Sequence, residues 1–96
     1  MPEPINQQAL KQLKNWVILD EKLHRVFILD DFIQAIGFMT QVSIVAEKMN
    51  HHPEWSNVYK TVTVDLTTHS EGCITQLDAE LAVSMDDIFN KINHKG

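Results

Sequence analysis

The sequence is poor in the features that would mark a secreted, redox-active or membrane protein. Its single cysteine, Cys73, leaves no partner for a disulfide within the chain and no CxxC redox motif. No apolar run approaches the roughly 20 residues that span a bilayer. The first residues, 1–6, lack the basic and apolar regions of a secretory leader. We therefore expect a soluble, cytoplasmic protein in which Cys73 is a small, partly buried residue near a turn.

Basic residues are also few. Eight lysines and arginines stand against thirteen acidic residues, which gives a formal net charge of −5. The basic residues are scattered rather than gathered in a stripe, so direct binding of nucleic acid is disfavoured. With only three glycines and three prolines, the composition also argues against disorder and fibrous architectures.

The length of 96 residues predicts a single domain spanning 1–96. A domain of this size buries only roughly 60–70% of the surface that its unfolded chain exposes, so its stability margin is thin. Assembly adds buried area, and we therefore expect a homodimer or a homotetramer.

Apolar periodicity predicts helices and strands in an interleaved order. Asn6 is a good N-cap for a first helix, and Asp31 with Gln34 forms a capping-box pattern for a long one. The expected elements are a helix over 6–14, strands over 16–19 and 23–29 with a hairpin at 20–22, a helix from Asp30 or Asp31 to before Pro53, a strand over 58–68, a turn at Gly72 and a helix over 75–92.

This order, α-β-β-α-β-(β)-α, is typical of an α+β fold, an antiparallel sheet with three helices packed on one face. The alternation in 58–68 places Val58, Val62, Val64 and Leu66 on the covered face. The opposite face would be polar, and it could meet water or a second subunit.

Histidine is the residue type most able to move protons at neutral pH. His51 and His52 end the long helix just before Pro53, and Glu47 precedes His51 by one helical turn, where it could orient the ring. His69 follows the strand over 58–68. The remaining two histidines, His24 in a strand and His94 in the tail, are given structural or solvent roles.

Each of these residues also has an ordinary structural explanation. A histidine pair at a helix end can cap carbonyl groups, and His69 can be an exposed turn residue. Asp78 forms a capping box with Thr75, and the two tryptophans, Trp16 and Trp55, can be packing aromatics. Three histidines could also hold zinc, but adjacent histidines splay apart and no H-E-x-x-H motif is present, so we expect no metal. Periodicity alone leaves the choice open.

The spacing of these residues resembles that of the pterin-4a-carbinolamine dehydratase family. The similarity is carried by Glu47-x-x-x-His51-His52-Pro53, then five residues to Tyr59, nine to His69 and eight to Asp78. It extends to the flanks, which are Trp16, Gly37-Phe38-Met39-Thr40, Glu54-Trp55-Ser56-Asn57-Val58 and Leu66-Thr67-Thr68. Asn15 departs from the glycine of many relatives, and the tail over 90–96 is longer and more polar than we expect.

The resemblance implies a function and roles for these residues. Family members dehydrate 4a-hydroxytetrahydropterin, the product left by aromatic amino acid hydroxylases, to quinonoid dihydropterin without a metal or redox cofactor. By position, His51 and His69 would be the acid and base, in either order, and His52 would hold the pterin substrate. Lesser roles fall to Glu47 as an orienting residue, to Asp78 as a hydrogen-bonding group, and to Trp16 and Trp55 as pocket walls.

The resemblance also implies a competing function and partners. An aromatic amino acid hydroxylase would be the metabolic partner. Some relatives bind a homeodomain transcription factor and act as dimerisation cofactors without touching DNA. A helix face left apolar on the surface of the monomer would favour that alternative, an interaction module without catalysis.

Overall fold

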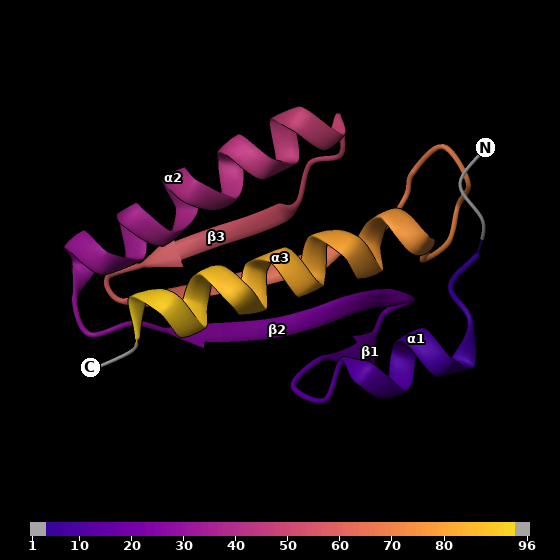
Figure 1. Cartoon of the computed structure of the whole chain (residues 1–96), viewed down its shortest axis with the longest axis horizontal. Coiled ribbons are helices and arrows are strands. Elements are labelled where there is room, and N and C mark those ends of the chain that lie inside the picture. Colours follow the sequence, from indigo (N-terminus) through magenta and orange to yellow (C-terminus); the bar gives the residue numbers. More distant parts are fainter. Residues whose placement is uncertain (1–3, 94–96) are drawn as a thin grey trace.

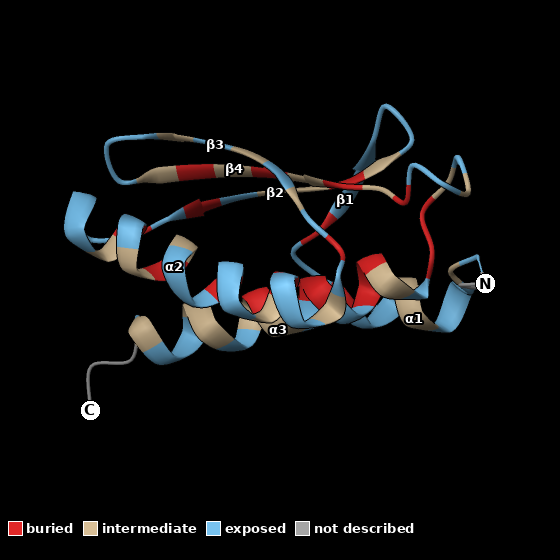
Figure 2. Cartoon of the chain, turned by 90° about the horizontal axis from the view of Figure 1, so that it is seen from above, coloured by how far each residue is buried: buried red, intermediate tan, exposed pale blue. Residues whose placement is uncertain are grey.

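Three helices lie on one face of a four-stranded antiparallel sheet in the computed structural model of the chain, which describes residues 4–93. Figure 1 and Figure 2 show this two-layer arrangement from two directions, and the strand order is β1-β2-β4-β3. In chain order the elements are α1 (Gln7–Gln12), β1 (Val17–Leu19), β2 (Lys22–Ile28), α2 (Phe32–Met49), β3 (Glu54–Val58), β4 (Thr61–Leu66) and α3 (Gln76–Ile92). The predicted α+β class and order of elements are confirmed.

Strands β1 and β2 form the predicted hairpin. Asp20 and Glu21 connect them with φ angles of 51° and 64°, and Leu19 pairs with Lys22. Two consecutive positive φ angles twist a two-residue turn in the sense that antiparallel strands need. The turn is therefore one residue shorter than the sequence suggested.

The prediction of one strand over 58–68 is wrong. The chain reverses at Tyr59, whose φ is 54°, so that β3 and β4 form a second hairpin in which Val58 pairs with Thr61. Val58 consequently lies on the face opposite to Val62, and it is 76% exposed. Tyr59 and Lys60 are not typical turn residues, and Lys60 is the one interruption of the apolar alternation between Val58 and Leu66.

The core lies between the sheet and the helices. Phe27 of β2 is fully buried and contacts the rings of Phe38 on α2 and Phe89 on α3, with centroid distances of 4.7 and 5.2 Å. The apolar residues of β4 that face the helices, Val62, Val64 and Leu66, are also buried. This packing fixes α2 and α3 against the sheet, and these are the helices that carry Glu47 and Asp78.

No helix covers the opposite face of the sheet within residues 4–93 (Figure 2). This open face is polar on β4, as predicted, but it is not polar throughout. Strand pairing places five exposed apolar residues on it, which are Val17, Leu19, Val26, Ile28 and Val58. In the same described range, no helix is both long and apolar enough to cross a membrane.

Candidate active site

The segments that carry His51, His52 and His69 meet at one end of the sheet. Glu54, the first residue of β3, pairs with Asp65 near the end of β4, so residues 51–53 and 67–69 leave the sheet side by side. Helix α3 begins at the same end, the right-hand end in Figure 1. Three motif segments far apart in sequence are therefore neighbours.

The end of α2 places His51. Asn50 takes the left-handed conformation, with a φ of 53°, and its N–H donates to the Glu47 carbonyl. The N–H of His51 donates to the Ala46 carbonyl at 3.0 Å. These two bonds form a Schellman motif, which satisfies the last carbonyls of the helix through backbone groups. The imidazole of His51 is thus left free for other contacts.

That imidazole contacts Asp78. The distance from His51 Nε2 to Asp78 Oδ1 is 2.6 Å, and Asp78 is completely buried. The other carboxylate oxygen, Oδ2, accepts from the Thr75 N–H and from the Thr68 hydroxyl, each at 2.8 Å. Asp78 therefore forms the predicted capping box with Thr75 and binds His51 at the same time.

The hydrogen bonds assign a tautomer to His51. Two donors already point at Oδ2 of Asp78, and an ionised carboxylate can only accept hydrogen bonds, so the donor in the contact with His51 is Nε2–H. No other residue within 4–93 makes a hydrogen bond to Nδ1 of His51, and no fully buried side-chain nitrogen or oxygen in that range lacks a partner. Nδ1 is therefore reached by solvent, and it can accept or donate a proton there.

The expectation that Glu47 orients His51 is wrong. Glu47 Oε1 lies 2.9 Å from Nε2 of His52 instead, and both side chains are largely exposed. The one-turn spacing applies only along a continuing helix. Because the chain turns at Asn50, His51 leaves the helical face and His52 takes the place beside Glu47.

His69 lies in the exposed turn that follows β4, and its side chain lies near that of Glu54. Its Nε2 atom is 3.8 Å from Glu54 Oε1, which in turn lies 2.7 Å from the Lys22 ammonium. The hydrogen bond from Lys22 lowers the pKa of the Glu54 carboxyl, with His69 as a weaker contributor, and Glu54 raises the pKa of Lys22. Glu54 stands on the open face of the sheet, so His69 lies near that face.

The two tryptophans have different positions. Trp16 is buried in the core, and its indole Nε1 donates to Asp86, eight residues beyond Asp78 on α3 and about 12 Å along the helix axis. Its role in this structure is packing rather than lining a pocket. Trp55 is partly buried beside the core on β3, next to Glu54 in the chain, and it remains a candidate wall of the site.

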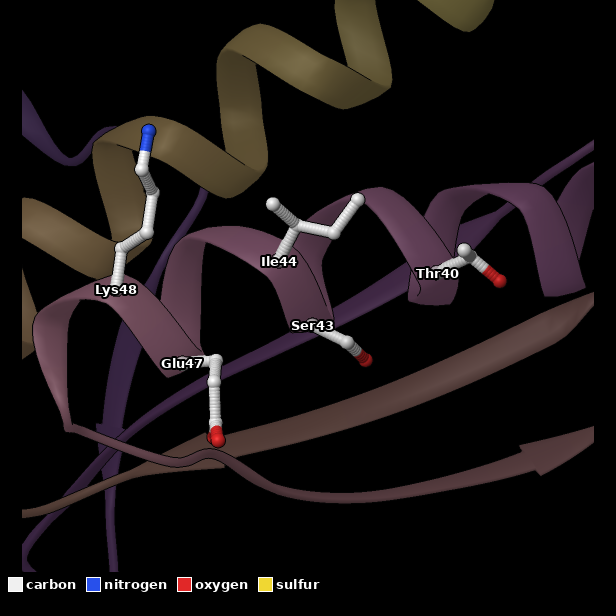
Figure 3. A pocket seen from close by; sticks show the side chains of 5 residues that line it. All are labelled: Thr40, Ser43, Ile44, Glu47 and Lys48. Carbon is white, nitrogen blue, oxygen red and sulfur yellow. The ribbon is translucent and has the colours of Figure 1, made fainter.

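A shallow hollow borders the site along α2. Figure 3 shows its lining, Thr40, Ser43, Ile44, Glu47 and Lys48, which all come from this one helix. Glu47 connects the hollow to His52. A surface made by one helix does not enclose a ligand, so the hollow is an edge of the site rather than its centre.

Thr68 was not singled out from the sequence as a site residue. It is buried, and its hydroxyl donates to Asp78. Its position directly before the motif histidine was the only available signal. Lys22 was missed as well, because its partner Glu54 is more than thirty residues away.

The remaining histidines and the possible metal ligands were also located. Within residues 4–93, no three side chains of histidine, cysteine, aspartate or glutamate are arranged to hold a metal ion. His24 pairs with Asp65 on the open face of the sheet. His94 and its predicted solvent role lie outside the described residues.

The chain matches a known family over most of its length. The family model described as pterin 4 alpha carbinolamine dehydratase matches residues 2–88. Among curated relatives, a protein from a Bradyrhizobium species is 54% identical over 87 residues, which cover 88% of this chain and 87% of the relative. One from Solibacter usitatus is 51% identical over 80 residues, or 83% of this chain and 84% of the relative. Both carry the name "Putative pterin-4-alpha-carbinolamine dehydratase".

A solved structure shares the fold. The crystal structure of a transcriptional coactivator/pterin dehydratase from Brucella Melitensis superposes with a TM-score of 0.84 at 41% sequence identity. The match covers 90% of this chain and 98% of that one.

Proposed function

The chain belongs to the pterin 4 alpha carbinolamine dehydratase family, and we propose that it catalyses the dehydration of 4a-hydroxytetrahydrobiopterin to quinonoid dihydropterin and water. The reaction would return a tetrahydropterin cofactor to its cycle after an aromatic amino acid hydroxylase has used it. The observation that carries the proposal is the pairing of His51 with the buried Asp78, which leaves Nδ1 of the ring open to solvent.

The proposed chemistry is acid–base catalysis by histidine. One protonated group delivers a proton to the hydroxyl on C4a, and the C–O bond breaks so that its electron pair leaves with water. The lone pair on N5 forms the C4a=N5 double bond, and a neutral group accepts the N5 proton. Positioned acids and bases typically contribute about 10²- to 10⁴-fold to such a step.

The proposed roles combine the family spacing with the positions of the side chains. His51 and His69 are the proposed acid–base pair, in either order. His52, exposed beside Glu47, would contact the bound pterin. Asp78 would act through His51, by holding the ring and keeping Nε2 protonated.

The experiment is stopped-flow ultraviolet absorbance of 4a-hydroxytetrahydrobiopterin decay. Wild-type protein should accelerate decay, and His51→Ala should remove most of that acceleration. His24→Gln is a matched control, because His24 also pairs with a carboxylate at 2.9 Å but lies on strand β2. If the substrate decays at the uncatalysed rate in the presence of wild-type protein, the proposed activity is rejected.

We also propose that the chain assembles into a homodimer or a homotetramer. The support is the set of exposed apolar residues on the open face of the sheet, since a monomeric surface seldom gathers such residues on one face. A second copy is the occupant that a domain of this size would use to add buried area.

One observation favours a second function, binding to a transcription factor. The neighbour from Brucella Melitensis is called a coactivator as well as a dehydratase. In this chain, Ile33, Ile36 and Ile44 of α2 are exposed at helical spacing, the apolar face that such a role would need. A reporter assay separates the two functions: Ile36→Glu with Ile44→Glu should abolish coactivation, and His51→Ala should preserve it.

A further inference from the structure

We propose that Thr68 is a positioning residue that fixes His51 and His69 relative to one another. The proposal rests on the dehydratase function above, in which those histidines move protons. Thr68 is buried, and within residues 4–93 it is the one residue whose side chain reaches the partner of His51 while its backbone anchors the turn that carries His69.

The side chain of Thr68 acts on Asp78. Its hydroxyl carries one hydrogen, which donates to Asp78 Oδ2 at 2.8 Å. The Thr75 hydroxyl, 2.6 Å away, must therefore donate to the Thr68 oxygen, and the Leu77 N–H donates to Thr75 Oγ1 in turn. The hydrogen bonds run in one direction and end on the carboxylate that holds His51.

The backbone of Thr68 acts on His69. The Thr68 N–H donates to the Cys73 carbonyl at 3.0 Å, and the Thr68 carbonyl accepts from the Gly72 N–H at 2.9 Å. Gly72 has a φ of 67°, which a glycine adopts without strain. These bonds close the turn that contains His69 directly after Thr68. Thr68 therefore contacts the structures that position both His51 and His69.

Removal of the hydroxyl has a defined consequence. Valine has nearly the shape of threonine, but it leaves Oδ2 of Asp78 with the Thr75 N–H as its only remaining donor from this network. It also removes the acceptor of the Thr75 hydroxyl. The carboxylate of Asp78 is then less firmly directed at His51, and the proton on the ring is shared between Nε2 and Nδ1.

The kinetic test compares Thr68→Val with Thr68→Ser in the dehydration assay. Thr68→Val should lower kcat about tenfold, the rate change equivalent to one hydrogen bond to a charged group. KM should stay within about twofold. Thr68 is buried and bonded to Asp78, so its substitution should leave the binding of the substrate in the ground state unchanged. Thr68→Ser keeps the hydroxyl, and it should restore kcat to within about threefold of the wild type.

A spectroscopic measurement separates this role from a merely structural one. The ¹⁵N resonances of the His51 ring, recorded at a pH where the ring is neutral, should show a protonated Nε2 and an unprotonated Nδ1 in wild type and Thr68→Ser. In Thr68→Val the two resonances should move toward each other. If Thr68→Val fails to fold, Thr68→Ala replaces it, and the same direction of change is expected because the hydroxyl is again absent.

The outcomes distinguish this proposal from the proposed function. Wild-type protein without dehydratase activity would reject the function, while the ¹⁵N resonances would still report whether Thr68 acts on His51. Unchanged resonances in Thr68→Val overturn the proposal, even if kcat falls, since Thr68 would then not act through Asp78. Changed resonances with an unchanged kcat overturn it as well.

Discussion

At the scale of single residues, the four histidines within 4–93 all lie within 4 Å of a carboxylate oxygen, but the four pairs differ in burial. The pairs of His52 with Glu47 and of His69 with Glu54 are largely exposed. The side chain of Asp78 is 0% exposed and that of His51 is 9% exposed. A charge removed from water interacts more strongly with its neighbours, so the His51–Asp78 pair can hold one tautomer where the exposed pairs cannot.

A first prediction concerns Asp78. In Asp78→Asn the side-chain amide must point its NH₂ group either at His51 or at the two donors on Oδ2, so one hydrogen bond becomes a clash of donors. We expect kcat to fall at least about tenfold, because the neutral ring then favours the wrong tautomer. Stopped-flow decay of the hydroxylated pterin measures this, and circular dichroism verifies the fold. A variant with wild-type kcat would show that Asp78 serves only as a helix cap.

A second prediction concerns Glu47, whose partner is His52 rather than His51. Exposed ion pairs contribute little, a median of about 0–1 kcal/mol. Glu47→Gln retains a hydrogen-bonding oxygen, so we expect kcat to change less than about threefold and the melting temperature to remain nearly the same. The same kinetic assay tests this, with Asp78→Asn as the matched carboxylate-to-amide comparison. A large loss of kcat in Glu47→Gln would place Glu47 in contact with the substrate.

Candidate site residues could be selected from the sequence, whereas the partner of His51 could not. His51, His69 and Asp78 could be selected because the family spacing survives in a single chain. The partner of His51 could not, because the one-turn rule that pointed to Glu47 ends where Asn50 enters the left-handed region. Asp78, the actual partner, lies 27 residues away and is brought near only by the packing of α3.

At the scale of elements, an ion pair crosses the sheet beside the site. Lys22 on β2 reaches Glu54 on β3 over the intervening strand β4. The lowered pKa of Glu54 stabilises the fold above the ordinary glutamate pKa, and this contribution is lost as the pH falls through the lowered value. The raised pKa of Lys22 stabilises the fold below the ordinary lysine pKa, and that contribution is lost as the pH rises through the raised value.

A third prediction follows from these two directions. Lys22→Met should lower the melting temperature between about pH 5 and pH 10, where both partners are charged, and the difference from wild type should shrink outside that window. It should also return the pKa of Glu54 toward its ordinary value. Thermal unfolding at several pH values measures the first effect. Lys14→Met is the control, since Lys14 is exposed and makes no ion pair within the described chain, and an equal effect there would contradict the prediction.

The three helices and the β1–β2 hairpin were predictable from the sequence, whereas the β3–β4 hairpin was not. Capping residues marked the starts of α1, α2 and α3, since Asn6, Asp31 and Thr75 each accept a backbone N–H there. The β3–β4 hairpin was not predicted, because its turn at Tyr59 contains no glycine, proline or asparagine. Without this turn Val58 was assigned to the covered face, whereas it lies on the open one.

At the scale of the whole molecule, part of the exposed apolar surface lies at the end of the sheet away from the chemistry, although Val17 and Leu19 lie nearer the histidine end. Strands β2 and β3 both pair antiparallel with β4, so their last residues, Ile28 and Val58, lie at the end of the sheet away from the motif histidines. Helix α2 starts at that far end with the exposed Phe32 and Ile33 (Figure 1). A second copy could cover this apolar end without closing the histidine end.

The last prediction tests the proposed assembly. Sedimentation equilibrium should show wild-type protein as a dimer or a larger species, and Ile28→Lys and Val58→Lys should each shift it toward the monomer, because burying an unpaired ammonium in an interface is costly. Both variants should keep kcat within about twofold, since the altered side chains are remote from His51 and His69. Gln8→Lys on α1 adds the same charge to an exposed position elsewhere, and it should leave the assembly unchanged. A monomeric wild type would reject self-association. A loss of kcat that accompanies dissociation would instead mean that the partner subunit completes the site, so that the two ends of the molecule are coupled through the assembly.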